Sequence, residues 1–159
     1  MTHSSPQPAP SDPYAAARAS AARLAELTGF PAHDAAVVLG SGWLPAADAL
    51  GEPDAQVPLA DLGGFPAATV AGHVPAVRSV RVGPLRVLVF LGRTHLYEGY
   101  EVAAVVHGVR TAVEAGCRVV VLTNASGGIR REFGVGQPVL ISDHLNLTAR
   151  SPLGGPPPP

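Results

Sequence analysis

The apolar residues of the chain repeat with a helical period in two long segments. In residues 14–27 apolar side chains recur every three or four positions, as they do on one face of a helix. Asp12 and Pro13 directly before this segment are typical of a helix N-terminus, and Gly29 is typical of a helix end. Residues 101–115 show the same period in their valines. Both segments are therefore predicted to be helices.

Short runs rich in Val, Leu and Ile predict strands between and after these helices. The runs are residues 35–39, 76–82, 85–91, 118–123 and 138–143. Gly83 and Pro84 separate the second run from the third, which predicts a hairpin, and we expect the other three runs to be buried strands. This order of strands and helices predicts an α/β fold, a mixed β-sheet flanked by helices.

The remaining segments set the limits of the domain. Residues 45–50 predict a short helix, and residues 51–74, rich in Gly and Pro, predict a long loop with short structured pieces. Residues 1–11 are expected to be a disordered leader, because they are rich in Ser and Pro. Residues 156–159 are four prolines, which cannot continue a helix or a central strand. We therefore expect residues 12–155 to form one domain, incomplete at its C-terminal side.

The composition excludes several classes of protein. Hydrophobic residues make up 47% of the 159 residues, which favours a compact globular domain. The formal net charge is −1, so we expect neither a nucleic-acid nor a membrane partner. No apolar run approaches the ~18–20 residues of a membrane span, and no secretory leader pattern is present, which predicts a cytoplasmic protein. The single cysteine, Cys117, excludes an internal disulfide and a cysteine-based metal site, and we expect a buried thiol there.

A Gly-Ser-Gly turn at residues 40–42 directly follows the first predicted strand. Its backbone N–H groups and the Ser41 hydroxyl would suit an anion. Two better-known glycine motifs do not fit, since a dinucleotide fingerprint needs glycine at Pro45 and a hydrolase nucleophile elbow needs glycine at Leu39. On these residues alone, a plain tight turn is an equal alternative.

Two further polar loops follow strands at residues 92–100 and 123–128. Alternation along an extended segment would place Arg93, His95 and Tyr97 on one side, where they could clamp phosphate and hydroxyl groups. The alternative is a solvated turn with an aromatic anchor. Small residues in the 123–128 loop would let a ligand approach the backbone closely. Because such loops meet at the carboxyl edge of a parallel sheet, the three together predict one ligand site.

The residues alone do not decide the roles of two histidines. His73 lies in the long loop, where a lone histidine is expected to be solvated. Asp143 and His144 could form an ion pair, a turn or part of a site.

The order and spacing of these motifs resemble the trimeric, low-molecular-mass purine nucleoside phosphorylases. The matching segments are residues 40–42, 65–66, 72–73, 92–100, 123–128 and 142–147, of which 92–100 is the most specific. The resemblance runs from about Tyr14 to Gly155. It implies phosphorolysis of purine (deoxy)ribonucleosides to a free purine and (deoxy)ribose 1-phosphate, in purine salvage. It also implies a homotrimer, with inorganic phosphate as co-substrate and no metal or organic cofactor.

The resemblance also assigns roles to individual residues. Phosphate would be bound by Ser41, His73, Arg93, His95 and the backbone N–H of Ala125. Tyr97 would pack beside the ribose of the nucleoside. His95 and Glu98 would be the catalytic residues, with Glu98 orienting the phosphate-binding groups.

The sequence departs from the family pattern in two places. Trp43 stands where the family usually has a smaller aliphatic residue. The family's purine-binding residues lie in a later half that has no counterpart here, so we expect phosphorolysis of inosine or guanosine by this chain to be absent or weak. The alternatives are an inactive fragment that at most binds phosphate and a methylthioadenosine phosphorylase, which the 92–100 segment disfavours. A dinucleotide oxidoreductase is a more distant alternative, because the sequence lacks the third glycine of the dinucleotide fingerprint.

Overall fold

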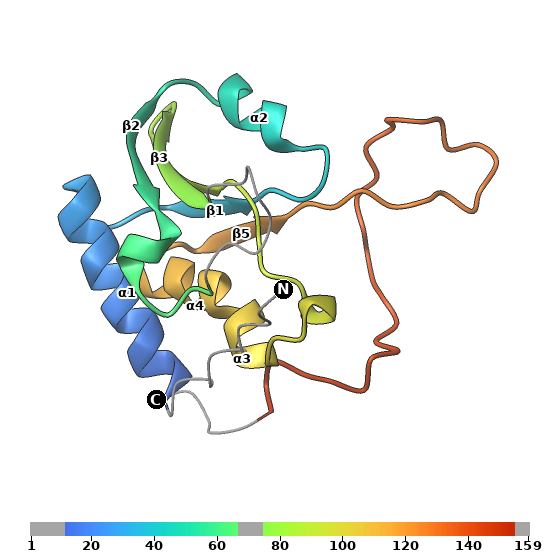
Figure 1. Ribbon diagram of the computed structural model, residues 1–159. Coiled ribbons are helices and arrows are strands. Elements are labelled where there is room, and N and C mark those ends of the chain that lie inside the picture. Colours follow the sequence, from blue (N-terminus) through green and yellow to red (C-terminus); the bar gives the residue numbers. More distant parts are fainter. Residues whose placement is uncertain (1–11, 67–74, 155–159) are drawn as a thin grey trace, which may run out of the picture.

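The computed structural model of the protein describes residues 12–66 and 75–154 and is built on one five-stranded sheet (Figure 1). The strand order is β2-β3-β4-β1-β5. The strands are Ala35–Val38 (β1), Pro53–Pro58 (β2), Ala76–Val82 (β3), Leu85–Phe90 (β4) and Val119–Leu122 (β5). β1 pairs in parallel with β4 and with β5, whereas β3 is antiparallel to β2 and β4. The predicted mixed α/β sheet is confirmed, and so is the hairpin of β3 and β4.

Helices cover both faces of this sheet. They are Pro13–Thr28 (α1), Leu44–Ala49 (α2), Val102–Val105 (α3) and His107–Glu114 (α4), with short 3-10 turns at Leu59–Leu62 (η1) and Leu96–Glu98 (η2). The predicted ends of α1 are confirmed. The Asp12 carboxylate accepts hydrogen bonds from the N–H groups of Tyr14 and Ala15, and Gly29 ends the helix at φ 75°, a left-handed conformation.

The core has two layers, one on each face of the sheet. The larger layer joins α1 and α4 to the sheet through buried residues such as Leu24, Leu88 and Ala112. The smaller layer lies under α2 and includes Leu39, Ala47 and Val89. Figure 1 shows α1 and α4 on one side and α2 on the other. The sheet is therefore held as a rigid platform between helices, with the carboxyl ends of β1, β4 and β5 at one edge.

Cys117 lies in the larger layer and is buried, as predicted. Burial raises the pKa of its thiol to about 11, with a smaller contribution in the same direction from the negative charge of Asp34. The thiol is thus structural.

The second predicted helix is divided in two. Val106 separates α3 from α4, and the residue that follows, His107, points into the core. Residues 51–58 also differ from the predicted loop, since they contain the edge strand β2. Its prolines stand at the first and last positions of an edge strand, where a missing N–H costs little.

The prediction of buried strands is wrong for the last two apolar runs. β5 forms and pairs with β1, but it is an edge strand with mostly exposed side chains. Residues 138–143 form no strand, and Leu140 is 97% exposed. The segment 124–154, here called the arm, contains no helix or strand and projects beyond the sheet before it returns toward α3 (Figure 1). Many of its apolar side chains are largely exposed, among them Ile129, Leu140 and Leu145.

The leader at residues 1–11, the prolines at 156–159 and His73 lie outside the described residues. None of the helices in the described ranges is long and apolar enough to cross a membrane.

A buried polar cluster closes the opposite end of the sheet. The Nε2 atom of His33 lies 3.0 Å from Ser79 Oγ, and both residues are buried. The Arg86 guanidinium lies 3.2 Å above the Phe30 ring and 2.7 Å from an Asp54 carboxylate oxygen. Burial, with the nearby positive charge of Arg86, lowers the pKa of His33 to about 4, although Asp34 acts in the other direction.

This pKa predicts that the protein loses stability in mild acid. The folded state keeps His33 neutral down to about pH 4, whereas in the unfolded chain the imidazole binds a proton near its ordinary pKa of 6.5. The free energy of unfolding should therefore fall by about 3 kcal/mol as the pH decreases through this interval, and not change from this cause above it. Burial also lowers the pKa of His107, which adds to the same trend.

Urea unfolding at several pH values measures this slope. His33→Gln should reduce it, since the amide can still bond Ser79 but takes up no proton. His144→Gln, in the exposed arm, serves as the control and should leave the slope in place. An unchanged slope in His33→Gln would contradict the assignment.

Candidate phosphate-binding site

The loops that follow β1 and β4 open into a single pocket of about 620 Å³. Its polar side is formed by Ser41, Arg93, Thr94, His95, Tyr97 and Glu98. The register of the sheet explains why these loops lie together. Val38 of β1 stands opposite Phe90 of β4 and Leu122 of β5, so the three strands end at the same level. Whatever follows each strand must then lie at the same edge.

Gly40 allows the loops after β1 and β5 to touch. Its N–H donates to Thr123 Oγ1 at 2.9 Å, and that hydroxyl lies 3.1 Å from the carbonyl oxygen of Val38. A Cβ at position 40 would collide with Arg93 Nη1, with the Thr123 carbonyl oxygen and with Asn124 Cα. Glycine is therefore required here by close packing of backbone against backbone.

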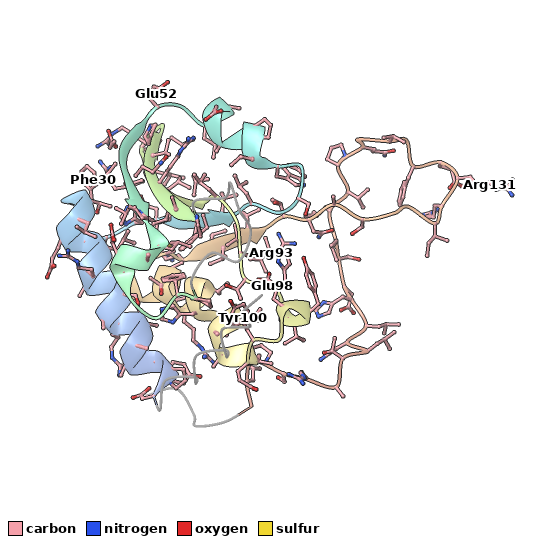
Figure 2. All side chains as sticks on the ribbon, viewed as in Figure 1. Phe30, Glu52, Arg93, Glu98, Tyr100 and Arg131 are labelled. Carbon is pink, nitrogen blue, oxygen red and sulfur yellow. The ribbon has the colours of Figure 1, made fainter. Side chains whose placement is uncertain are left out.

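Arg93 extends across the ends of the strands. It follows β4, and its Nη1 donates to the carbonyl oxygen of Thr123 at 3.0 Å. Figure 2 shows Arg93 near the end of β5, with Glu98 beside it on the segment that leads to α3. This bond orients the exposed guanidinium across the strand ends, and a guanidinium is well suited to a bidentate grip on phosphate.

His95, Tyr97 and Glu98 form a compact unit around the η2 turn. Glu98 Oε1 accepts the backbone N–H of His95 at 2.9 Å and lies 2.7 Å from its Nδ1. The Tyr97 ring stacks on the His95 ring at 4.7 Å. Since the carboxylate accepts a hydrogen from Nδ1, Nε2 is the ring nitrogen through which His95 can contact a ligand. The predicted extended segment gives way to a 3-10 turn at Leu96–Glu98, yet the rings of His95 and Tyr97 still stack on one side.

The opposite side of the pocket is apolar. It includes Phe65, Phe90, Val105 and Val109, and is formed by the sheet, α3, α4 and the segment after η1. A pocket with a polar edge and an apolar wall suits a ligand that has an anionic group on a less polar body.

A buried histidine supports this apolar wall. His107 Nε2 lies 2.9 Å from Ser20 Oγ of α1, and the Phe65 ring packs edge-on against the imidazole at 4.6 Å. Gly64 is so close to His107 that a Cβ there would collide with the ring. His107 therefore links α1, α4 and the Phe65 segment. Its lowered pKa, caused mainly by burial, favours the neutral ring.

The structure gathers most of the predicted site residues but not all of them. Ser41, Arg93, His95, Tyr97 and Glu98 line the pocket, whereas Ala125 is exposed on the arm and does not. His73 lies outside the described residues, so its predicted role stays a prediction. In the described part of the chain, no cluster of three or more His, Cys, Asp or Glu side chains could hold a metal ion.

Sequence reasoning named three further residues near the site without predicting the contacts that they make. Thr123 bridges the ends of β1 and β5, Trp43 bonds the Asn124 carbonyl, and Phe65 forms part of the wall. The small-residue loop at 123–128 indicated close approach, but a ligand was expected there and the partner is the Gly40 turn.

Gly40→Ala is expected to destabilise the fold and open the site. The new methyl group must push apart backbone atoms of the loops after β1 and β5, at a cost of about 1–3 kcal/mol. Urea unfolding measures the loss. Gly92→Ala is the matched control in the same pocket, because no atom lies within 4 Å of the added Cβ. Equal stability of the two variants would contradict the close packing described here.

Comparison with known proteins assigns the chain to a family. Residues 34–159 match the family model of the phosphorylase superfamily. The purine nucleoside phosphorylase of Mycobacterium tuberculosis is 58% identical over 144 residues, which cover 91% of this chain and 54% of that protein. The enzyme of the same name from Cellulomonas sp is 55% identical over 150 residues, covering 91% and 53%.

Solved structures agree with the sequence matches. Isoform 2 of purine nucleoside phosphorylase from Schistosoma mansoni, solved with cytosine and ribose-1-phosphate, has a TM-score of 0.66 at 30% identity, and the match covers 74% of this chain and 41% of that one. The chain thus spans about half the length of its relatives. The chain belongs to the phosphorylase superfamily, and the relatives that it matches within it are named purine nucleoside phosphorylases.

Proposed function

We propose that this chain supplies the phosphate- and ribose-binding side of a purine nucleoside phosphorylase site. The observation that carries the proposal is the meeting of Ser41, Arg93 and His95 in one pocket at the carboxyl ends of two neighbouring parallel strands. The Ser41 hydroxyl and the Arg93 guanidinium offer several hydrogen-bond donors to a tetrahedral anion. With its Nδ1–H given to Glu98, the neutral His95 ring presents Nε2 as an acceptor for the hydroxyl of a hydrogen phosphate ion, and the protonated ring would donate there instead. The Schistosoma mansoni structure, solved with ribose-1-phosphate, supports a sugar phosphate as the ligand class.

In the proposed reaction, a phosphate oxygen bonds to C1′ of the ribose as the bond from C1′ to the purine nitrogen breaks. The electron pair of that bond leaves with the purine, which takes up the proton that hydrogen phosphate gives up, and the products are free purine and (deoxy)ribose 1-phosphate. Positive charge grows on the ribose as the bond breaks. A phosphate held in place both stabilises this charge and attacks it, so the protein acts by positioning and electrostatic preorganisation.

Each of the polar residues has a part in this proposal. Ser41 and Arg93 hold the phosphate, and His95 contacts it through Nε2. Glu98 fixes His95 by accepting its backbone N–H and by lying 2.7 Å from Nδ1. Tyr97, stacked on His95, is placed to pack beside the ribose. No metal or organic cofactor enters this chemistry, and inorganic phosphate is the co-substrate.

We also propose, from the resemblance, that the enzyme works as a homotrimer in cytoplasmic purine salvage. These finer assignments rest on the family pattern of residues 92–100 and 123–128 rather than on the fold of one chain.

Phosphate binding tests the site directly. Titration calorimetry with inorganic phosphate should show binding that Arg93→Ala weakens by about tenfold or more and Ser41→Ala by about three- to tenfold, since charged hydrogen bonds are worth more than neutral ones. Arg131→Ala removes a cation at the far end of the arm (Figure 2) and is the control. Unchanged affinity in both site variants would contradict the proposal.

Turnover tests the reaction class. The chain can be joined to the residues that follow the matched region in the Mycobacterium tuberculosis relative, and phosphorolysis of inosine and guanosine followed. Arg93→Ala in this chimera should raise the KM for phosphate by about tenfold or more, with a smaller change in the KM for inosine. An effect confined to nucleoside affinity would overturn the roles assigned above.

A further inference from the structure

Trp43 makes a long-range hydrogen bond that the proposed chemistry does not use. Its indole Nε1–H donates to the carbonyl oxygen of Asn124 at 2.9 Å, across 81 positions of sequence. Its backbone N–H also donates to the Gly40 carbonyl oxygen at 3.1 Å, which closes the turn that carries Ser41. Trp43 does not line the pocket.

The turn at residues 40–43 is therefore anchored on both sides of Ser41. On one side the Gly40 N–H bonds Thr123 Oγ1, and on the other the Trp43 indole bonds the Asn124 carbonyl. Both anchors lie on the loop that follows β5. The turn is also restrained where it joins β1 and α2, so the indole bond adds to these restraints, and without it the Ser41 hydroxyl would have more freedom.

The same loop also holds Arg93. The Thr123 carbonyl accepts from Arg93 Nη1, and the next carbonyl along the chain, that of Asn124, accepts from Trp43. Two consecutive carbonyl groups thus orient two anion-binding elements that come from different strands. Their spacing relative to each other depends on both bonds.

The hydrogen bond from Trp43 to Asn124 orients the turn but is accompanied by little burial of apolar surface. Trp43 is 37% exposed, and its ring is absent from both buried core clusters. Loss of the indole N–H should therefore cost little of the hydrophobic free energy that holds the fold together. It should instead increase the freedom of Ser41 and the entropy lost when phosphate orders the turn.

We propose that Trp43 is a positioning residue of the phosphate site, whose indole N–H fixes Ser41 relative to Arg93 through the Asn124 carbonyl. The inference rests on the proposed phosphate site and adds to it a group that does not touch the ligand. Loss of the N–H should weaken phosphate binding by about three- to tenfold, the range for one neutral hydrogen bond, with a small change in melting temperature.

The test uses the fact that the chain has a single tryptophan. Replacing tryptophan during expression by benzothienylalanine exchanges the N–H of this one residue for sulfur and keeps the bicyclic shape. Replacing it by 7-azatryptophan keeps the N–H donor. Trp43→Phe gives a third, genetically encoded loss of the donor. Phosphate affinity is measured by titration calorimetry and melting temperature by circular dichroism.

We expect benzothienylalanine and Phe to raise the Kd for phosphate, and 7-azatryptophan to leave it within about twofold of the native value. Phe133→Leu is the matched control, because Phe133 is also 37% exposed but lies in the arm. A structural role alone would change the melting temperature of the benzothienylalanine protein and leave its phosphate affinity unchanged.

Two outcomes overturn the inference in different ways. Native-like phosphate affinity in the benzothienylalanine protein refutes the role of Trp43 and leaves the phosphate site standing. Absence of phosphate binding by the native chain refutes the phosphate site and the positioning role together. If Trp43→Phe fails to fold, the isosteric analogue still decides between these outcomes.

Discussion

The parallel pairing of β1 with β4 on one side and β5 on the other is the constraint on which the site depends. In-register pairing ends all three strands at one level, so the loops after them must pack closely against one another. Gly40 makes this close packing possible, because only a residue without a Cβ lets the turn after β1 lie against Thr123 and Arg93. The polar side of the pocket is a consequence of that contact.

The two sides of the pocket are stabilised in different ways. The polar side is held by hydrogen bonds between loops, in which backbone carbonyls orient Arg93 and Trp43. The apolar side is held by the packing of Phe65 against His107, which in turn bonds Ser20 of α1. The first arrangement fixes donors before a ligand arrives, which is what electrostatic catalysis requires. The second shapes the volume that remains for the body of the ligand.

The sequence predicted the strand-end loops well and their mutual contacts poorly. Each loop follows a short apolar run, so Ser41, Arg93 and His95 could be placed at one sheet edge. The bond from Trp43 to Asn124 spans 81 positions, and no local pattern reveals it. Residues 138–143 have the composition of a strand, but a strand also needs a partner, and none is present in the described residues. Local propensity was right for β1, β3, β4 and β5, where the sheet supplied that partner, but it missed β2, whose two prolines are typical of a loop.

Cys117 gives this protein a built-in reporter of internal motion. The only thiol of the chain is buried between α1, α4 and the sheet, and its raised pKa disfavours the reactive thiolate. A thiol reagent can therefore label the native protein only during openings of that helical layer. Labelling rates would therefore report openings of the core, separately from any change in the turn at residues 40–43. The chain thus carries two separate reporters, the Cys117 thiol for its core and the Trp43 indole for the turn that carries Ser41.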